Sequence, residues 1–186
     1  MRPPAALADI TRESERIGFT MASEPKTGSL LRTLAASKPE GRFLELGTGT
    51  GVAAAWLLDG MGERARLDTV DNDATAAEIA RRHLGGDPRI SFHIADGSSF
   101  LAAQRSSQFD FIFADAWPGK FTDLDRALSL LKPGGLYVVD DLLPQPNWPK
   151  GHAAKVPALI AQLESQTGFE STSIEWASGL MILARR

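Results

Sequence analysis

The stretch FLELGTGTGVAAAW, residues 43–56, reads as a buried strand that runs into a glycine loop and then into a helix. The apolar run over 42–46 predicts the strand, and the small and apolar residues after Val52 predict the helix. The three glycines between them permit positive φ and let a ligand approach the backbone closely. This stretch therefore predicts a strand–loop–helix unit whose loop holds a ligand.

Strands and helices alternate on both sides of this unit. Strands are expected at 42–46, 66–71, 89–95, 109–114 and 136–141, and helices at 74–84, 97–105, 121–132 and 153–167. Two further strands at 171–177 and 180–185, separated only by Ser178 and Gly179, predict a tight hairpin. The pattern indicates an α/β fold with a doubly wound parallel sheet and an antiparallel strand from the hairpin at or beside its edge.

The composition indicates one globular domain over residues 1–186, with a helical extension at 1–36 and a core at 37–186. The net charge of −3 gives no basic surface for nucleic acid, and the absence of cysteine excludes disulfides, thiolate metal sites and a cysteine nucleophile. No apolar run approaches the roughly 18 residues of a membrane span, and the first residues lack a signal-peptide core. The expected compartment is the cytoplasm, with no membrane or nucleic-acid partner.

The glycine loop favours a nucleoside that is cationic and lacks a phosphate. Its glycines have the spacing G-x-G-x-G, so Val52 stands where a dinucleotide-binding loop has its third glycine. The acidic residue Glu45 lies two residues before the first glycine of the loop. Asp71, at the end of the second strand, suits the hydroxyls of a ribose. S-adenosylmethionine fits this combination, whereas a purely structural turn is the plainer alternative.

Further candidates for this cofactor lie at the same sheet edge. Asp96 follows the third strand and can accept from an adenine amino group, beside backbone donors at Gly97. The plainer reading of Asp96 is a helix N-cap, and the two roles are compatible. Thr48 in the loop and Asn72 after Asp71 complete the expected cofactor-binding residues.

Four segments resemble the class I S-adenosylmethionine-dependent methyltransferases, and among them the small catechol and caffeoyl-CoA O-methyltransferases: MASEPKTGSLL (21–31), ELGTGTG (45–51), FDFIFADAWPGKF (109–121) and LKPGGLYVVDDLL (131–143). The resemblance implies a Rossmann-like, seven-stranded sheet whose last strand is antiparallel, and a segment at 21–31 that closes over the cofactor. It implies a tryptophan, here Trp117, beside the adenine. The cofactor contacts that it implies are Glu45, Gly47, Gly49, Gly51, Asp71, Gly97 and Asp115.

The same resemblance implies a divalent cation, such as Mg²⁺, held by Asp115, Asp140 and Asp141 at the ends of the fourth and fifth strands. Carboxylate oxygens suit such hard cations, and the ion would lower the pKa of a substrate hydroxyl. Asp141 stands where the family has asparagine. The three acids could bind the ion more strongly, or Asp141 could cap a loop with no metal bound.

The catalytic residues expected beside Asp115 are Lys120 and His152. The family's catalytic lysine falls on Pro118 here, and Lys120 follows two positions later. Lys120 could act as general base, or it could be a surface lysine paired with Asp123 or a neighbouring acid. His152, after the proline-rich loop 142–152, has a side chain whose ordinary pKa suits proton abstraction, or it is a solvated residue at a helix start.

The leading hypothesis is an enzyme that transfers a methyl group from S-adenosylmethionine to a hydroxyl oxygen of a small molecule. Methylation of protein or RNA is the second hypothesis, although the missing basic patch opposes RNA. A non-catalytic cofactor-binding module and a nucleotide-dependent dehydrogenase are the others. Related enzymes dimerise, so a homodimer is an expected assembly.

Overall fold

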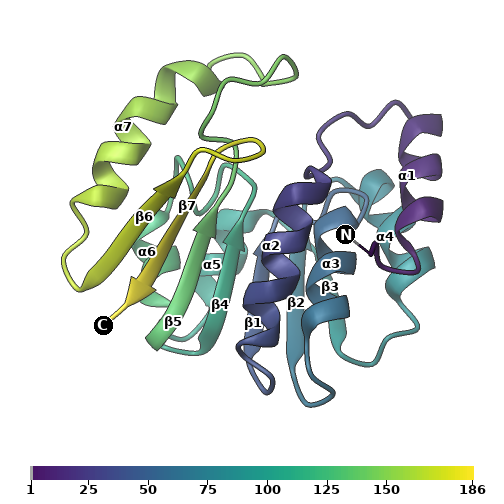
Figure 1. The fold of residues 1–186 in the computed structure, drawn as a ribbon, viewed down its shortest axis with the longest axis horizontal. Coiled ribbons are helices and arrows are strands. Elements are labelled where there is room, and N and C mark those ends of the chain that lie inside the picture. Colours follow the sequence, from purple (N-terminus) through teal and green to yellow (C-terminus); the bar gives the residue numbers. More distant parts are fainter. Residues whose placement is uncertain (1) are drawn as a thin grey trace.

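The computed structural model describes residues 2–186, so only Met1 of the expected extension lies outside the described residues. It shows a seven-stranded sheet in the order β3-β2-β1-β4-β5-β7-β6 (Figure 1). The strands are β1 (Arg42–Leu46), β2 (Arg66–Asp71), β3 (Ile90–Ile94), β4 (Phe109–Ala114), β5 (Leu131–Val139), β6 (Phe169–Ile174) and β7 (Leu180–Arg185). The first five pair in parallel and β7 is antiparallel to both neighbours, which confirms the expected doubly wound sheet.

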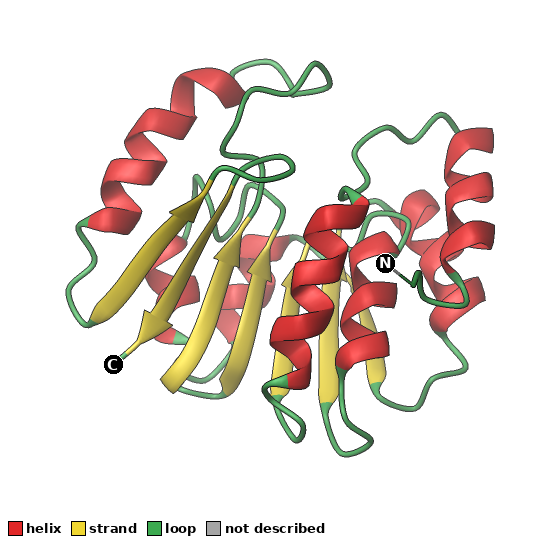
Figure 2. Ribbon diagram, in the orientation of Figure 1, coloured by secondary structure: helices red, strands yellow, loops and turns green. Residues whose placement is uncertain are grey.

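Helices cover both faces of this sheet, and loops gather at the carboxyl ends of the parallel strands (Figure 2). The helices are α1 (Leu7–Arg16), α2 (Pro25–Ala36), α3 (Val52–Gly60), α4 (Ala74–Leu84), α5 (Gly97–Ala103), α6 (Leu124–Ser129) and α7 (His152–Glu164). Successive side chains of a strand point to opposite faces, so Phe43 packs in the core under α1–α4, and Leu44 packs in the core under α5–α7. No helix within residues 2–186 is long and apolar enough to cross a membrane.

Two local expectations were wrong. The helix expected at 121–132 is the shorter α6, because Leu131 is fully buried and already pairs with Phe109 in the sheet. The following Pro-Gly-Gly lies inside β5, at a shift in the strand register, instead of ending a helix.

The closing hairpin also differs from the expectation. Five residues, 175–179, join β6 to β7, and Ala177 and Gly179 both adopt positive φ. The expected two-residue turn at Ser178 and Gly179 is therefore wrong. The longer connection reaches back toward β5, where the backbone N–H of Leu143 donates to the carbonyl of Ser178 at 2.8 Å.

The strand order reverses between β1 and β4, and this positions the site. From β1 the chain builds toward β3, whereas from β4 it builds toward the opposite edge. The backbone N–H of Asp115, just after β4, donates to the carbonyl of Leu46 at 2.8 Å. A Cβ at Gly47 would lie 2.8 Å from the Asp115 carbonyl oxygen, so this close approach requires glycine. Ligands of such sheets bind in the crevice at this reversal.

Candidate functional site

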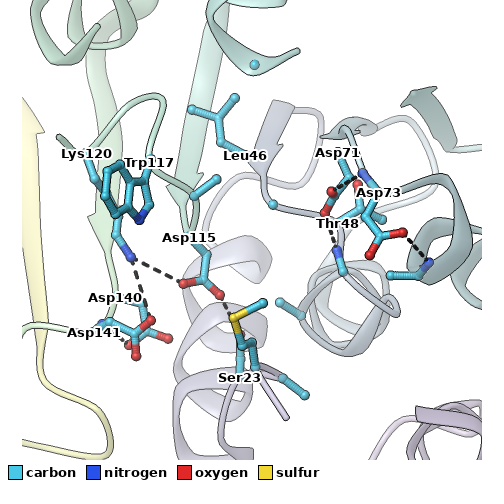
Figure 3. Close-up of a pocket in the computed structure, with 18 of the residues that line it drawn as sticks. Ser23, Leu46, Thr48, Asp71, Asp73, Asp115, Trp117, Lys120, Asp140 and Asp141 are labelled. Atoms are coloured by element: carbon cyan, nitrogen blue, oxygen red, sulfur yellow. Dashed lines mark hydrogen bonds and ion pairs between the residues drawn. The ribbon is translucent and has the colours of Figure 1, made fainter. Parts of the chain in front are cut away.

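A cavity of about 580 Å³ lies over this reversal. Its volume is in the range of sites that enclose a small ligand. One end is formed by the glycine loop and Asp71, and the other by Lys120, Asp140 and Asp141, with Asp115 between the two ends (Figure 3). Of the expected site residues, the cavity wall includes Gly47, Thr48, Gly49, Asp71, Asn72, Asp96, Gly97, Asp115, Trp117, Lys120, Asp140, Asp141 and His152.

Asp71 holds the glycine loop in place. Its Oδ2 accepts from the backbone N–H of Gly49 at 2.7 Å, and its Oδ1 accepts from the backbone N–H of Asp73 at 2.8 Å. Asp73 in turn caps the N-terminus of α4. Each carboxylate oxygen can accept more than one hydrogen bond, so Asp71 can still receive two hydroxyls from the cavity.

Two of the expected contacts, Gly51 and Glu45, lie behind the cavity wall. Gly51 begins α3 at a φ of 92°, and a Cβ there would lie 2.7 Å from the Cβ of Ala80, so its absence lets α3 approach α4. Glu45 is fully buried in the central strand. Direct contact between either residue and a cofactor stays a prediction.

Glu45 is connected to the loop by a chain of hydroxyls. The Thr69 hydroxyl donates to Oε2 of Glu45 and lies 2.6 Å from the hydroxyl of Thr48 in the loop. Oε1 of Glu45 is buried without a hydrogen-bond partner among the described residues. Burial raises the pKa of Glu45 to about 8, and the hydrogen bond from Thr69 only partly offsets it.

Asp96 and Trp117 both line the cavity. Oδ1 of Asp96 caps α5 by accepting from the backbone N–H and the hydroxyl of Ser99, at 2.8 and 2.9 Å, and the backbone hydrogen bond is the main cause of its lowered pKa. A Cβ at Gly97 would lie 2.9 Å from Pro118, so the chain after β4 closes onto the start of α5. The helix-capping role of Asp96 is thus present, and its cofactor role stays a prediction.

The three acids at the other end surround a lysine. The Nζ of Lys120 lies 3.4 Å from Oδ1 of Asp115 and 3.8 Å from Oδ2 of Asp141, and the lysine side chain is only 2% exposed (Figure 3). Lys120 is therefore not on the surface, and its partners are neighbouring acids other than Asp123. Burial, and to a smaller extent the nearby negative charge of Asp141, raises the pKa of Asp140 to about 6. Burial also raises the pKa of Asp115 well above its usual value, although the positive charge of Lys120 opposes the shift.

These acids do not fit a divalent cation in this arrangement. No group of three or more Asp, Glu or His side chains with the geometry of a metal site occurs within residues 2–186. Lys120 stands between Asp115 and Asp141, and Oδ1 of Asp140 already accepts from the Ser178 hydroxyl and from the backbone N–H of Asp141. Oδ1 of Asp115 and Oδ1 of Asp140, two of the oxygens that Mg²⁺ would need, are thus already paired with protons of the protein itself.

His152, at the start of α7, is buried at the rim of this cluster. Its Nε2 lies 3.1 Å from the carbonyl oxygen of Asp141, and its ring stacks on Trp148 with centroids 4.4 Å apart. A carbonyl can only accept, so in the neutral ring Nε2 carries the hydrogen and Nδ1 has the free lone pair. Burial lowers the pKa of His152, which keeps the imidazole neutral.

The N-terminal segment before α2 also supplies cavity residues. The Ser23 hydroxyl donates to Oδ2 of Asp115 at 3.2 Å, and Phe19 packs against Gly49. These residues carry no motif, and only the resemblance of 21–31 pointed to the segment. Gly28 in that segment allows close packing in the core, since a Cβ there would lie 2.2 Å from the buried indole of Trp56.

Residues 44–142 match a family model described as a methyltransferase domain. The chain belongs to this methyltransferase domain family. The matched residues run from β1 to the residue after the three carboxylates, and so include the glycine loop, Asp71 and Lys120.

Curated relatives of this methyltransferase domain include two proteins that are provisionally assigned as O-methyltransferases. The one from Mycolicibacterium vanbaalenii is 32% identical over 123 residues, which cover 63% of this chain and 54% of the relative. The one from Mycobacterium leprae is 31% identical over 140 residues, covering 73% of this chain and 62% of the relative. The chain thus matches little more than half the length of these relatives.

Solved structures share the fold over nearly the whole chain. The O-methyltransferase TomG from Streptomyces achromogenes, in complex with S-adenosylmethionine, has a TM-score of 0.83 at 23% identity, covering 99% of this chain and 91% of TomG. An O-methyltransferase from Bacillus cereus, in complex with S-adenosylhomocysteine, has a TM-score of 0.84 at 19% identity, covering 100% and 93%. The seven-stranded Rossmann-like fold is confirmed.

Proposed function

We propose that this protein is an S-adenosylmethionine-dependent methyltransferase that methylates a hydroxyl oxygen of a small molecule. The observation that carries the proposal is the single cavity that joins the Asp71 end to the Lys120 and His152 end through Asp115. One end offers hydroxyl acceptors suited to a nucleoside, and the other offers a buried ammonium and a neutral imidazole suited to activating an oxygen. The O-methyltransferase assignments of the curated relatives support the same reaction.

The residues of the cavity fit the cofactor by their chemistry. Asp71 would hold the ribose hydroxyls, Asp96 and Trp117 the adenine, and the loop from Gly47 to Gly49 the methionyl group. Among the described residues, Lys120 is the one lysine or arginine in the cavity wall, and it is paired with acids. A site for a pyrophosphate would require free cations or amides in place of these carboxylates, which argues against a dehydrogenase.

The chain's own residues provide for proton removal and orientation. When bound, the cofactor supplies a methyl group on a sulfonium, whose carbon–sulfur bond breaks as the new carbon–oxygen bond forms. Nδ1 of His152 takes the proton from the acceptor hydroxyl, while the Lys120 ammonium stabilises the negative charge on its oxygen. Trp148 and Phe121 pack against the His152 ring and limit access of water.

Titration with S-adenosylhomocysteine in a calorimeter tests the proposed function. We expect a dissociation constant in the micromolar range at neutral pH, and no heat with NADH. A protein that binds NADH but not S-adenosylhomocysteine would contradict the proposal. After cofactor binding is established, a panel of phenols and catechols can be screened for methyl transfer.

The substitution His152→Gln tests the proposed base. We expect kcat to fall by about 100-fold with any acceptor found in the screen, because general-base catalysis commonly contributes a factor of this size. Since burial lowers the pKa of His152, the wild-type rate should fall on acidification only below the ordinary histidine pKa of 6.5. His83→Gln, which replaces a histidine paired with Glu13, is the matched control. An equal loss in both variants would exclude His152 as the base.

A further inference from the structure

We propose that the Lys120 ammonium is a built-in cation that takes the place of a divalent metal ion in binding the acceptor oxygen. This inference rests on the proposed methyl transfer, and it predicts an enzyme that needs no metal and an acceptor that needs only one hydroxyl. It is carried by the position of Nζ between Asp115 and Asp141, at 3.4 and 3.8 Å from their carboxylate oxygens, on the cavity wall (Figure 3).

A tight turn after β4 delivers the lysine to this position. The backbone N–H of Lys120 donates to the carbonyl of Trp117 at 3.0 Å, and Gly119 between them has a φ of 90°. The Tyr137 hydroxyl donates to the Gly119 carbonyl at 2.5 Å, and a Cβ on Gly119 would lie 2.5 Å from Leu46. The turn is therefore fixed from two sides, and its buried lysine points into the acid cluster instead of into solvent.

The position of the ammonium is incompatible with a metal ion on the same oxygens. Mg²⁺ binds oxygen at about 2.1 Å and in near-octahedral geometry. An ion bound to Oδ1 of Asp115 and Oδ2 of Asp141 would lie no more than about 5.5 Å from Nζ, where two cations in a partly buried site repel each other strongly. Asp141, which stands where the resembled enzymes have asparagine, is one of the two partners of the lysine. The lysine that is displaced by two positions and the aspartate that replaces asparagine are thus partners in one ion pair.

An ammonium constrains the acceptor differently from a metal ion. It has three N–H donors; one donates to Asp115 at 3.4 Å, whereas Asp141 at 3.8 Å is an ion-pair partner without a hydrogen bond. Each N–H that faces the cavity holds a single acceptor oxygen, whereas a metal ion can bind two neighbouring oxygens at once. The site therefore suits acceptors with an isolated hydroxyl, with no requirement for a vicinal diol.

Titration with Mn²⁺ tests, without any acceptor, whether Lys120 prevents a divalent metal ion from binding at the acid cluster. Calorimetric titrations with MnCl₂ would be made on protein saturated with S-adenosylhomocysteine, comparing the wild type with Lys120→Met. Methionine fills similar space and removes the charge, so the three carboxylates become available to the ion. The matched control is Lys155→Met, because Lys155 Nζ lies over the Trp117 ring, 5.3 Å from its centroid, and outside the acid cluster.

We expect no Mn²⁺ binding below millimolar concentration in the wild type and in Lys155→Met, and at least tenfold tighter binding in Lys120→Met. Micromolar Mn²⁺ binding by the wild type, or no gain in Lys120→Met, would overturn the inference. If Lys120→Met does not fold, the double variant Lys120→Met with Asp141→Asn removes one of the unpaired acids and undergoes the same titration. Failure to bind S-adenosylhomocysteine would instead contradict the proposed function, so the two failures are distinguishable.

The choice of acceptor provides the second measurement. With wild-type protein in EDTA, we expect methylation of monohydroxylated phenols with kcat/KM within tenfold of that for the matched catechols. Activity confined to catechols, or loss of activity in EDTA that Mg²⁺ restores, would overturn the inference.

Discussion

Replacement of Asp71 by alanine is expected to weaken binding of S-adenosylhomocysteine by about 100-fold. Hydrogen bonds to a charged group are each worth about 1.5–3 kcal/mol, and the loss of two ribose hydroxyl contacts at the lower end of this range corresponds to roughly this factor. The substitution also releases the backbone N–H of Gly49, which Asp71 now holds at 2.7 Å. Isothermal calorimetry on the folded variant measures the effect directly.

Two matched variants separate ribose binding from support of the loop. Asp71→Asn keeps one acceptor oxygen, and we expect its affinity to fall by about tenfold. Asp73→Ala removes the neighbouring acid and the cap of α4, so it should lower the melting temperature while changing the dissociation constant less than threefold. An Asp71→Ala protein that binds as tightly as the wild type would refute the ribose role.

The second large effect concerns Glu45 and pH. A carboxyl whose pKa is raised to about 8 by burial keeps its proton in the folded protein at pH values where the unfolded chain has lost it. Glu45 therefore contributes fully to the free energy of unfolding when the pH is below 4.5, the pKa of its side chain in the unfolded chain. This contribution declines as the pH rises to 8. The decline between pH 5 and pH 8 is on the order of 4 kcal/mol.

Glu45→Gln removes this dependence, because glutamine can accept from Thr69 without ionising. We expect urea unfolding to show that the variant gains stability relative to the wild type as pH rises from 5 to 8. Asp115 and Asp140 are present in both proteins, so the difference between the two curves reports Glu45 together with its interactions with Asp115 and Asp71. A difference that is constant with pH would show that Glu45 does not titrate in this range.

The sequence predicted the fold well where local patterns decide it. The glycine loop, the apolar strands and the short connections each identify their element without tertiary information, and they fix the sheet edge that carries the site. The errors at 121–132 and 175–179 have tertiary causes. Leu131 joins β5 because Phe109 lies beside it, and the turn before β7 is held by the backbone at Leu143.

The candidate site was predictable at strand ends and less so elsewhere. Asp71 ends its strand, and Asp115 and Asp140 directly follow theirs, so the topology alone brings them to one cavity. The burial of Lys120 depends on Gly119 and Tyr137, which are distant from each other in sequence. Ser23 and Phe19 reach the site through the path of an irregular segment, for which no periodic pattern exists.

One hydrogen bond across the cavity mouth has a consequence for fragments of the chain. The Asn147 side-chain amide donates to the carbonyl of Thr20 at 2.7 Å, so the segment before α2 and the loop before α7 meet there. Each belongs to a different terminal third of the chain, and each supplies walls of the same cavity. Neither half of a split protein can therefore enclose a ligand alone, and complementation of two fragments, divided in the exposed turn at Gly86, would report ligand-competent assembly.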